Sequence, residues 1–479
     1  MREFFEILQH IFNFIFFSFG FMIISSYMLL AIISYFALKK YVKKSTFTNY
    51  HNIISSPFAP GVSVIAPAYN ESKTIIENIN ALLSLFYHDF EVIIINDGST
   101  DDTLEKVINH FKLEKVNMAF DYHIPTQPIR GVYKSSKLSQ KSLIVIDKEN
   151  GGKADALNAG INISSKPLFT VIDVDSILDN ETLCKLVKPF LEETDKTVIA
   201  TGSVIHIANS CIIDKGQVIQ VRFPEKWLAR FQSIEYNRAF LLGRMAWGKL
   251  NGLLLISGAI GMFNKQVIVE CGGYSTETVG EDMELIVRVR RYLEDKGEKY
   301  SVIYIPDPLC WTEAPETLKV LGKQRNRWTR GTIETLFKHS KLFFNPKYKL
   351  MGMFSYPYWF FFEWLAPIME IFGLTYFTVL SILGMTSWPF FLLMLFFIYS
   401  FAVGFSIWSI FFSEISFNKY TGQGELLKQL ATAFLEPFFY HPLVVFWAIK
   451  GNIDYFRGKK QWGKMDRKGF KTKNVQQST

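Results

Sequence analysis

Cysteine is scarce in this chain of 479 residues, which has only Cys184, Cys211, Cys271 and Cys310. Their spacing matches no set of metal ligands, so a cysteine-based metal site is excluded, and we expect reduced side chains that pack in the core. The sequence also lacks an internal repeat, a low-complexity linker and any motif for binding DNA or RNA. Repeat architectures and nucleic-acid partners are therefore excluded.

Apolar residues, by contrast, are abundant: 49% are hydrophobic and 16% aromatic, which is high for a soluble enzyme. The run from 11 to 38 is almost unbroken and long enough to cross about 30 Å of hydrocarbon as a helix. A cleavable signal peptide is the alternative, but the run is too long and has no small-residue cleavage site. Lys39, Lys40, Lys43 and Lys44 follow at once. Because basic residues stay on the cytoplasmic side, we expect the N-terminus outside and the following residues in the cytosol.

The apolar character returns after residue 350. Residues 356–384 and 388–413 predict two further spans joined by a tight hairpin. A fourth stretch, 431–449, contains two prolines and leads into a basic tail. A full crossing would place that tail outside, so we predict a re-entrant or interfacial segment. The net charge of +8 comes partly from these flanks, which favours contact with anionic lipid headgroups over nucleic acid.

Between the membrane segments, strands and helices alternate. Buried strands are predicted at 62–66, 91–95, 143–146 and 169–172, helices at 74–86, 101–112 and from about 153, and a loop at 121–141. This alternation predicts an α/β fold with a parallel sheet whose ligands bind at the carboxyl ends of the strands. Seven polar residues fall at or just past such ends: Tyr69, Asn70, Glu71, Asp97, Lys153, Asp173 and Asp175.

Three polar clusters follow one another along the chain. Asp173 and Asp175 are suited to hold a divalent cation beside a diphosphate, because carboxylates are natural ligands of hard cations. Asp282, with Glu281 as its neighbour, is the candidate for a base that takes a proton from a sugar hydroxyl. The third cluster runs from 324 to 328: Gln324 offers a neutral hydrogen-bonding group, Arg327 a fork of donors for the diphosphate, and Trp328 a flat face for a sugar.

Each cluster also has a structural interpretation. An Asp-x-Asp pair is common at strand ends, acidic residues favour the first turn of a helix, and residues 324–328 fit a surface helix with Trp328 at a membrane interface. The order of all three clusters ahead of an apolar tail favours the functional interpretation. Glu363 and Glu370 lie on one face of the predicted span 356–384, where ionisable groups often face a water-filled path, and bordering a glycan channel is one hypothesis for them.

Residues 60–345 resemble the family 2 inverting glycosyltransferases of GT-A (Rossmann-like) fold. With the flanking apolar segments, the chain is similar to the membrane-embedded polysaccharide synthases that make cellulose, hyaluronan and chitin, and its layout is most similar to that of the poly-N-acetylglucosamine synthases. Nearly the whole chain takes part in this resemblance. Gly280 stands where cellulose synthases usually have Thr, which leaves the donor sugar open.

The resemblance implies a role for each motif. Residues 68–71, with Tyr69 and Glu71, and Asp97 would hold the uracil and ribose of a uridine diphosphate donor, and the run 150–158 would place Lys153 near the diphosphate and Asp155 near the nucleoside. Asp175 would be the metal ligand, Asp173 its donor-side companion and Asp282 the general base. Gln324, Arg327 and Trp328 would close over the donor and flank the acceptor end, and Ser257 to Ala259 match an acceptor-side turn loosely.

These expectations define four parts: an N-terminal transmembrane helix and basic flank (1–44), a cytosolic GT-A glycosyltransferase domain (45–345), a C-terminal transmembrane region (346–450) and a basic cytosolic tail (451–479). We expect a multi-pass enzyme of the inner (plasma) membrane. It would use a UDP-sugar, with GlcNAc or Glc as the sugar, and Mg²⁺ or Mn²⁺ to extend and export a β-linked polysaccharide.

Expected partners are the UDP-sugar donor, a glycan acceptor, the lipid bilayer and an accessory export or regulatory protein. The alternative enzyme is a non-processive transferase acting on a lipid acceptor. A catalytically silent scaffold is disfavoured because every essential carboxylate is present.

Overall fold

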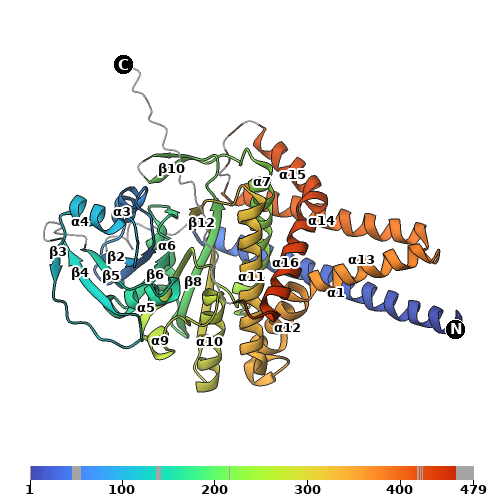
Figure 1. Cartoon of the computed structure of the whole chain (residues 1–479), viewed down its shortest axis with the longest axis horizontal. Helices are drawn as coiled ribbons and strands as arrows, with labels where there is room; N and C mark the ends of the chain where they lie inside the picture. The colour runs from blue at the N-terminus through green and yellow to red at the C-terminus, as the bar shows by residue number, and fades with distance from the viewer. Residues whose placement is uncertain are drawn as a thin grey trace, which may run out of the picture.

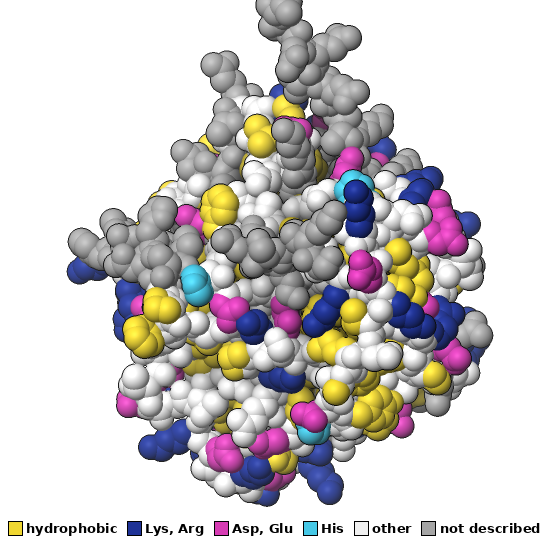
Figure 2. Space-filling model, turned by 90° about the vertical axis from the view of Figure 1, so that its left-hand side faces the viewer, with side chains coloured by type: hydrophobic (Ala, Val, Ile, Leu, Met, Phe, Trp, Pro, Cys, Tyr) yellow, Lys and Arg dark blue, Asp and Glu magenta, His cyan; other side chains and the backbone are white. Residues whose placement is uncertain are grey.

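The computed structural model of the protein describes residues 2–45, 56–135, 142–214, 216–417, 420, 422 and 424–459. An α/β domain lies beside a group of long apolar helices that project away from the sheet (Figure 1). The face of the domain opposite to those helices carries acidic and basic side chains interspersed with apolar ones (Figure 2). This mixture is typical of a solvent-facing surface.

Strands of the α/β domain form one ten-stranded sheet and a separate two-stranded one. The strands are β1 (Val62–Ala68), β2 (Phe90–Asp97), β3 (Glu114–Val116), β4 (Ile129–Lys134), β5 (Ser142–Lys148), β6 (Leu168–Ile172), β7 (Ile177–Leu178), β8 (Thr197–Ile207), β9 (Ile212–Asp214), β10 (Gln217–Gln220), β11 (Ile260–Asn264) and β12 (Tyr300–Thr312). In the large sheet the order is β3-β4-β5-β2-β1-β6-β11-β8-β12-β7, and β9 pairs with β10.

The predicted strands are confirmed, but the sheet is mixed rather than parallel. β1 is parallel to β2 and β6, and β2 is parallel to β5. β11 runs antiparallel between β6 and β8, and β4 pairs antiparallel with β5. β4 falls inside the predicted loop 121–141, so that prediction is wrong for residues 129–134, while 136–141 lie outside the described residues. Pairing with β5 orders a segment whose glycine, prolines and serines had indicated a loop.

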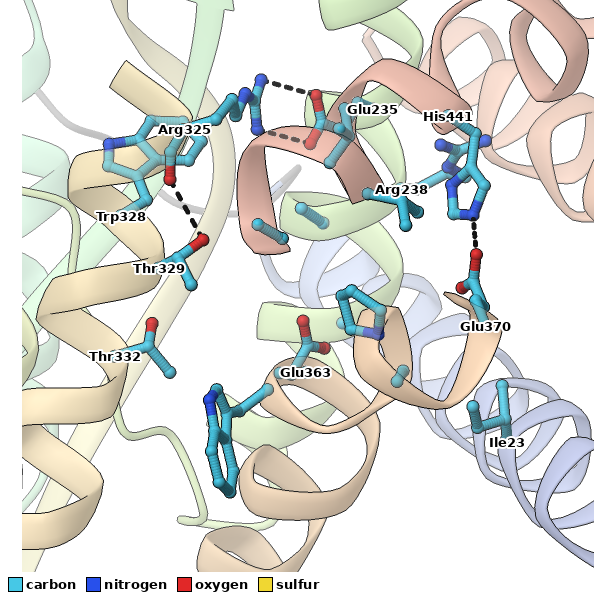
Figure 3. Close-up of a pocket in the computed structure, with 18 of the residues that line it drawn as sticks. Ile23, Glu235, Arg238, Arg325, Trp328, Thr329, Thr332, Glu363, Glu370 and His441 are labelled. Carbon is cyan, nitrogen blue, oxygen red and sulfur yellow. Dashed lines mark hydrogen bonds and ion pairs between the residues drawn. The ribbon is translucent and has the colours of Figure 1, made fainter. Parts of the chain in front are cut away.

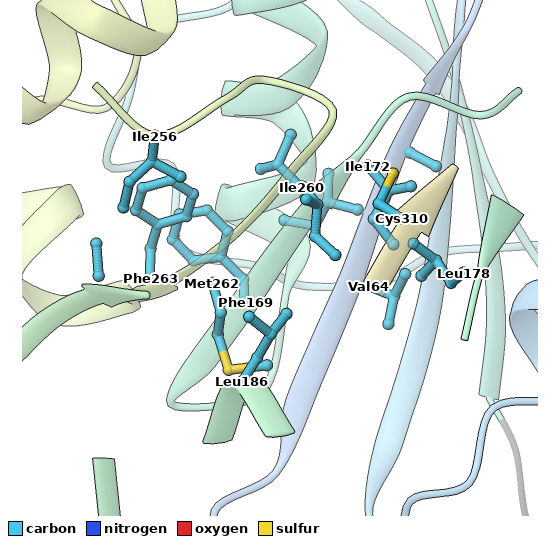
Figure 4. Packing of buried hydrophobic residues seen from close by; sticks show 14 of the residues in the cluster. Val64, Phe169, Ile172, Leu178, Leu186, Ile256, Ile260, Met262, Phe263 and Cys310 are labelled. Carbon is cyan, nitrogen blue, oxygen red and sulfur yellow. The ribbon is translucent and has the colours of Figure 1, made fainter. Parts of the chain in front are cut away.

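Helices cover the sheet: α3 (Ile75–Leu83), α4 (Thr103–Phe111), α5 (Lys153–Ile163), α6 (Thr182–Glu192), α7 (Trp227–Asn237), α8 (Met245–Lys249), α9 (Lys265–Glu270), α10 (Glu281–Lys296) and α11 (Leu318–Lys338). The core between sheet and helices includes Phe169 on β6 and Phe263 on β11, whose stacked rings lie 5.3 Å apart (Figure 4). All eight residues of β2 are buried, as expected for a central strand covered on both faces. The carboxyl ends of β1, β2 and β6 are thereby held in fixed register.

Two helices are long and apolar enough to cross a membrane: α1 (Arg2–Ser45) and α14 (Trp388–Phe417). α1 confirms the apolar helix predicted at residues 11–38, and α14 confirms the one predicted at 388–413. Further short helices connect the α/β domain with this region: η1 (Arg238–Arg244), η2 (Ser340–Leu342), η3 (Pro346–Tyr348), η4 (Met351–Ser355) and α12 (Tyr356–Tyr358). Among the described residues, up to four spans are present if each of two bent helix pairs counts as one.

The predicted span 356–384 is not straight. The helical segment Met351–Trp364, which ends with η5 (Trp359–Trp364), and α13 (Ala366–Ile382) meet at a bend of 42°. Pro367 in the first turn of α13 explains the bend, since it lacks an N–H group and its ring crowds the carbonyl one turn earlier. Likewise α15 (Glu425–Phe439) and α16 (His441–Phe456) meet at 46°, with Pro442 in the first turn of α16. The re-entrant character of 431–449 stays a prediction.

Candidate active site

A buried ion-pair network ties the ends of β2 and β5 to the start of α5. The Nζ atom of Lys148, a fully buried residue, lies 2.7 Å from Asp97 Oδ1 and 2.5 Å from Asp155 Oδ1. The Asp97 carboxylate also accepts hydrogen bonds from the N–H groups of Gly151 (3.0 Å) and Gly152 (2.8 Å). Breaking a buried ion pair by removing one partner costs about 3–5 kcal/mol. The network therefore fixes the glycine turn before α5, which positions Lys153.

The turn after β1 lies beside this network and carries Tyr69, Asn70 and Glu71. Asn70 has a φ of 57°, in the left-handed region that Asn tolerates better than most residues. Its Oδ1 accepts a hydrogen bond from the Thr100 N–H at 2.8 Å, and the Glu71 N–H donates to Thr103 Oγ1 at 3.0 Å. Tyr69 is 42% exposed. The turn is thus locked against the segment before α4, while the Tyr69 ring stays accessible.

Lys153 joins the glycine turn to the end of β6. Its Nζ lies 2.5 Å from Asp173 Oδ1 and donates to the Gly258 carbonyl at 3.2 Å. Burial by itself lowers the pKa of Lys153, but the carboxylates of Asp173 and Glu281 outweigh it and hold the pKa above its usual value. A permanently charged ammonium at this position is suited to a diphosphate. The Lys153 side chain is paired and largely buried, so it is not a solvated lysine at a helix start.

Asp175 lies two residues beyond Asp173 and is half-buried. Within the described ranges, no group of three or more His, Cys, Asp and Glu side chains is placed to hold a metal ion. A hard cation such as Mg²⁺ is commonly held by one or two carboxylates, with substrate phosphates and water completing its coordination. A single aspartate or an aspartate pair at the end of β6 fits that mode, in which the protein by itself forms no complete cage.

Asp282 and Glu281 occupy the first turn of α10. Asp282 Oδ2 accepts a hydrogen bond from the Gly258 N–H at 3.1 Å. Gly258 therefore contacts both residues: its carbonyl accepts from Lys153, and its amide orients Asp282. Burial raises the pKa of Glu281, Asp282 adds to this effect, and Lys153 opposes it. Asp282 and Glu281 therefore lie in different environments, and the turn at 257–259 links the acidic cluster to the diphosphate side.

The motif of residues 324–328 lies on α11. Gln324, Arg327 and Trp328 line a cavity, and the Oε1 atom of Gln324 is buried without a hydrogen-bond partner among the described residues. Trp328 is 40% exposed, and the guanidinium of Arg325 lies over its ring at 4.3 Å. One face of the indole is therefore occupied by Arg325, which limits sugar stacking to the other face.

Arg325 is itself held by a buried network (Figure 3). Its guanidinium forms a bidentate pair with Glu235 on α7, with N–O distances of 2.6 and 2.7 Å, and donates to the Tyr440 hydroxyl at 2.8 Å. Tyr440 in turn donates to Glu235 Oε2 at 2.6 Å. Because Tyr440 lies at the bend between α15 and α16, the network connects the motif helix with the C-terminal helix pair.

A close backbone contact brings α10 and α11 together. A Cβ atom on Gly280 would lie 2.7 Å from the Cα of Gly331, and one on Gly331 would lie 2.7 Å from the Cα of Gly280. Contacts this short do not occur in relaxed structures, so both positions require glycine. The Gly280 position is therefore explained by packing, and its departure from the Thr of cellulose synthases says nothing by itself about the donor sugar.

One cavity of about 1480 Å³ collects most of the predicted site. Its lining includes Lys153, Asp173, Glu281, Asp282, Gln324, Arg327 and Trp328. The remaining predicted site residues do not line it: Tyr69, Glu71, Asp97, Asp155 and Asp175 lie nearby, at the ends of β1, β2 and β6 or in α5. The cavity also extends along α1, α13 and α14 and is bordered by Glu363 and Glu370, the latter paired with His441 at 2.8 Å.

Three functional positions were missed from the sequence: Lys148, Arg325 and Glu235. The signal for Lys148 was a lysine that follows the apolar run 143–146 at the end of a strand, and Arg325 lies inside the recognised motif. Glu235 carries no local signal, because its partner lies 90 residues further along the chain.

The sequence family described as glycosyltransferase like family 2 matches residues 60–331. Poly-beta-1,6-N-acetyl-D-glucosamine synthase from Staphylococcus epidermidis is 30% identical over 332 residues, which cover 69% of this chain and 67% of that protein. The enzyme of that name from Staphylococcus aureus strain COL is 30% identical over 281 residues, covering 58% and 56%. Among solved structures, the mannosyltransferase PcManGT from Pyrobaculum calidifontis, in complex with GDP-Man and Mn²⁺, is 14% identical, covers 92% of this chain and 98% of its own, and has a TM-score of 0.49.

The family match spans β1 to α11 and so includes the sheet ends, the first turn of α10 and the motif of α11. It agrees with the mixed α/β architecture, and the predicted GT-A class and glycosyltransferase activity are confirmed. The chain belongs to glycosyltransferase family 2.

Proposed function

We propose that this glycosyltransferase transfers N-acetylglucosamine from its uridine diphosphate donor to the end of a growing β-linked polysaccharide and passes the polymer across the membrane. The observation that carries the proposal is the single cavity that borders both Asp282 and the apolar helices α1, α13 and α14. A product that leaves the acceptor side of the site has a continuous path toward the bilayer. The relatives named poly-beta-1,6-N-acetyl-D-glucosamine synthases support the choice of sugar and polymer.

On the donor side, Asp97 and Tyr69 would flank the nucleoside, while Lys153 and Arg327 would bind the diphosphate. The departing diphosphate accumulates negative charge, and these two fixed cations stabilise it most when the bond to the sugar breaks. Mg²⁺ or Mn²⁺ held by Asp175, with Asp173 beside it, would supply further charge neutralisation. Asp175 would be the principal ligand, and Asp173, which pairs with Lys153, would be its companion on the donor side.

On the acceptor side, Asp282 would take the proton of the attacking hydroxyl. The Gly258 amide donates a hydrogen bond to its carboxylate and so orients it. Glu281 is the weaker candidate because it is buried, and burial raises its pKa and so favours its protonated form. Gln324 would bind a sugar hydroxyl through its unsatisfied Oε1, and the free face of Trp328 would pack against the apolar face of a sugar ring.

The proposed location is the plasma membrane, with several crossings and the α/β domain in the cytoplasm. The basic flank of α1, which includes Lys43 and Lys44, supports this orientation. The domain limits given above and an accessory export or regulatory protein are part of the same proposal.

Purified protein in vesicles, incubated with each labelled UDP-sugar, tests the proposal. We expect UDP-GlcNAc to give a long product that resists extraction into butanol and is degraded by a glycan hydrolase. The Asp282→Asn variant is the matched control for chemistry, since it keeps the size of the side chain. A butanol-soluble product with one sugar would instead establish the lipid-acceptor alternative and overturn the polymerase proposal.

A further inference from the structure

A second pocket, of about 750 Å³, lies away from the catalytic cavity between α11 and α16. The two helices run side by side (Figure 1), and Asn326 on α11 donates to Asp454 on α16 at 2.9 Å. Five basic side chains line this groove: Lys319, Lys323, Arg330, Lys450 and Lys459. We call it the α11/α16 groove. Among the described residues that line it, Asp454 is the single carboxylate, so this lining carries a large positive charge.

The positive charge is only partly compensated within the protein. Lys459 pairs with Asp454 at 2.6 Å. Lys319 and Lys450 form no ion pair with any carboxylate in the described part of the chain. Cations drawn to one concave site repel one another, so a ligand of opposite charge would be stabilised there.

Arg330 makes the groove a built site rather than a chance grouping of surface lysines. It is only 5% exposed, and its Nη1 donates to the Lys459 carbonyl at 2.6 Å, which fixes the guanidinium at the groove wall. A planar guanidinium held in place among the four lysines that line the groove is an arrangement that recognises phosphate oxygens.

The groove shares α11 with the active site. Asn326 and Arg330 face the groove, while Gln324, Arg327 and Trp328 line the catalytic cavity. A ligand that bridges Lys319 or Lys323 to Lys450 would hold α11 against α16. Two apolar side chains, Leu318 and Trp447, also line the groove, and Leu318 is 54% exposed. Basic pockets beside such apolar surface are suited to phospholipid headgroups, and the same oxygens are offered by a soluble phosphate.

We propose that the α11/α16 groove binds a phosphate-bearing anion and that this anion clamps the motif helix α11 to α16. The groove is separate from the site of the donor diphosphate, and the clamp does not depend on which sugar the enzyme transfers. It would lie on a different face of α11 from Gln324, Arg327 and Trp328.

The test measures the apparent melting temperature of the full chain in nanodiscs, without added divalent cation. One arm compares phosphatidylcholine alone with phosphatidylcholine plus phosphatidylglycerol. The other adds inorganic phosphate to phosphatidylcholine nanodiscs, with sodium chloride at equal ionic strength as the reference. Because a ligand that binds only the folded state raises the melting temperature, we expect an increase of several degrees in the arm that supplies the ligand.

The Lys319→Glu/Lys450→Glu variant should lose most of that increase. Lys112→Glu/Lys115→Glu reverses two charges near the β3 edge of the sheet and is the matched control, which should keep the increase. If charge reversal prevents folding, Lys319→Gln/Lys450→Gln replaces it. A groove-dependent increase with phosphatidylglycerol alone identifies a lipid headgroup, and one with phosphate identifies a soluble ligand. No increase in the wild-type protein, or an increase that both groove variants retain in full, would overturn the proposal.

Discussion

The contact between Gly280 and Gly331 gives a sharp test of how the site is assembled. In the Gly280→Ala variant, the new Cβ would start 2.7 Å from the Gly331 Cα, whereas nonbonded carbon atoms prefer about 3.5–4.0 Å. The first turn of α10 and α11 must therefore separate by about 1 Å. That shift moves Asp282 relative to Arg327 and Trp328. Because a misplacement of about 1 Å can cost about 10²-fold in rate, we expect turnover to fall by roughly that factor.

The assay is the rate of sugar transfer at saturating donor, together with UDP affinity. UDP affinity should fall less than turnover, because Asp97 and Lys153 lie on elements that do not contain the substitution and, of the proposed UDP contacts, only Arg327 lies on one of the two shifted helices. Gly404→Ala is the matched control: its site on α14 has no atom within 4 Å of the added Cβ. Near-normal turnover of Gly280→Ala in a folded protein would refute the conclusion that this close approach sets the geometry of the site.

Three further outcomes are expected. Asp175→Ala should abolish the cation-dependent part of UDP binding, measured by calorimetry with and without Mn²⁺; undiminished affinity would contradict the metal assignment. Asp282→Asn should lower turnover by about 10² to 10⁴-fold with UDP affinity nearly unchanged, and near-normal synthesis would point to Glu281 as the base. Burial holds the pKa of His339 below its usual value, although Glu284 opposes this effect. Near pH 6 the folded state therefore binds fewer protons than the unfolded state, and the free energy of unfolding should decrease as the pH falls below about 6.5. Denaturant titrations should show a weaker decrease for His339→Gln, and an equal decrease would remove His339 as the cause.

Local patterns in the sequence were sufficient for the central strands and the helices that follow them. After Glu91, the run of residues 92–95 has no polar position, and such a run is typical of a strand covered on both faces. The almost unbroken apolar segment of residues 11–38 similarly predicted a helix, because a helix satisfies its own backbone groups within a membrane. The polar residues past the strand ends could be assigned to one edge of the sheet by topology alone.

Pairing between distant strands was beyond these patterns. β4 lies in a segment rich in turn-forming residues, and it is ordered by its hydrogen bonds to β5. The antiparallel insertion of β11 between β6 and β8 likewise depends on partners more than 50 residues away. The bend before α13 did have a local signal, Pro367, but a proline permits a kink without fixing its angle.

The sequence by itself determined which chemical groups are available at the site: the carboxylates of Asp173, Asp175 and Asp282 and the motif on α11. Only the tertiary structure decided how they are held. Lys148 at the end of β5 forms buried ion pairs with Asp97 at the end of β2 and with Asp155. Arg325 pairs with Glu235 on another helix, and the backbones of Gly280 and Gly331 are in direct contact. Each of these depends on a contact between segments far apart in the chain, and the energy of such a contact is a property of the packed fold rather than of local residue order.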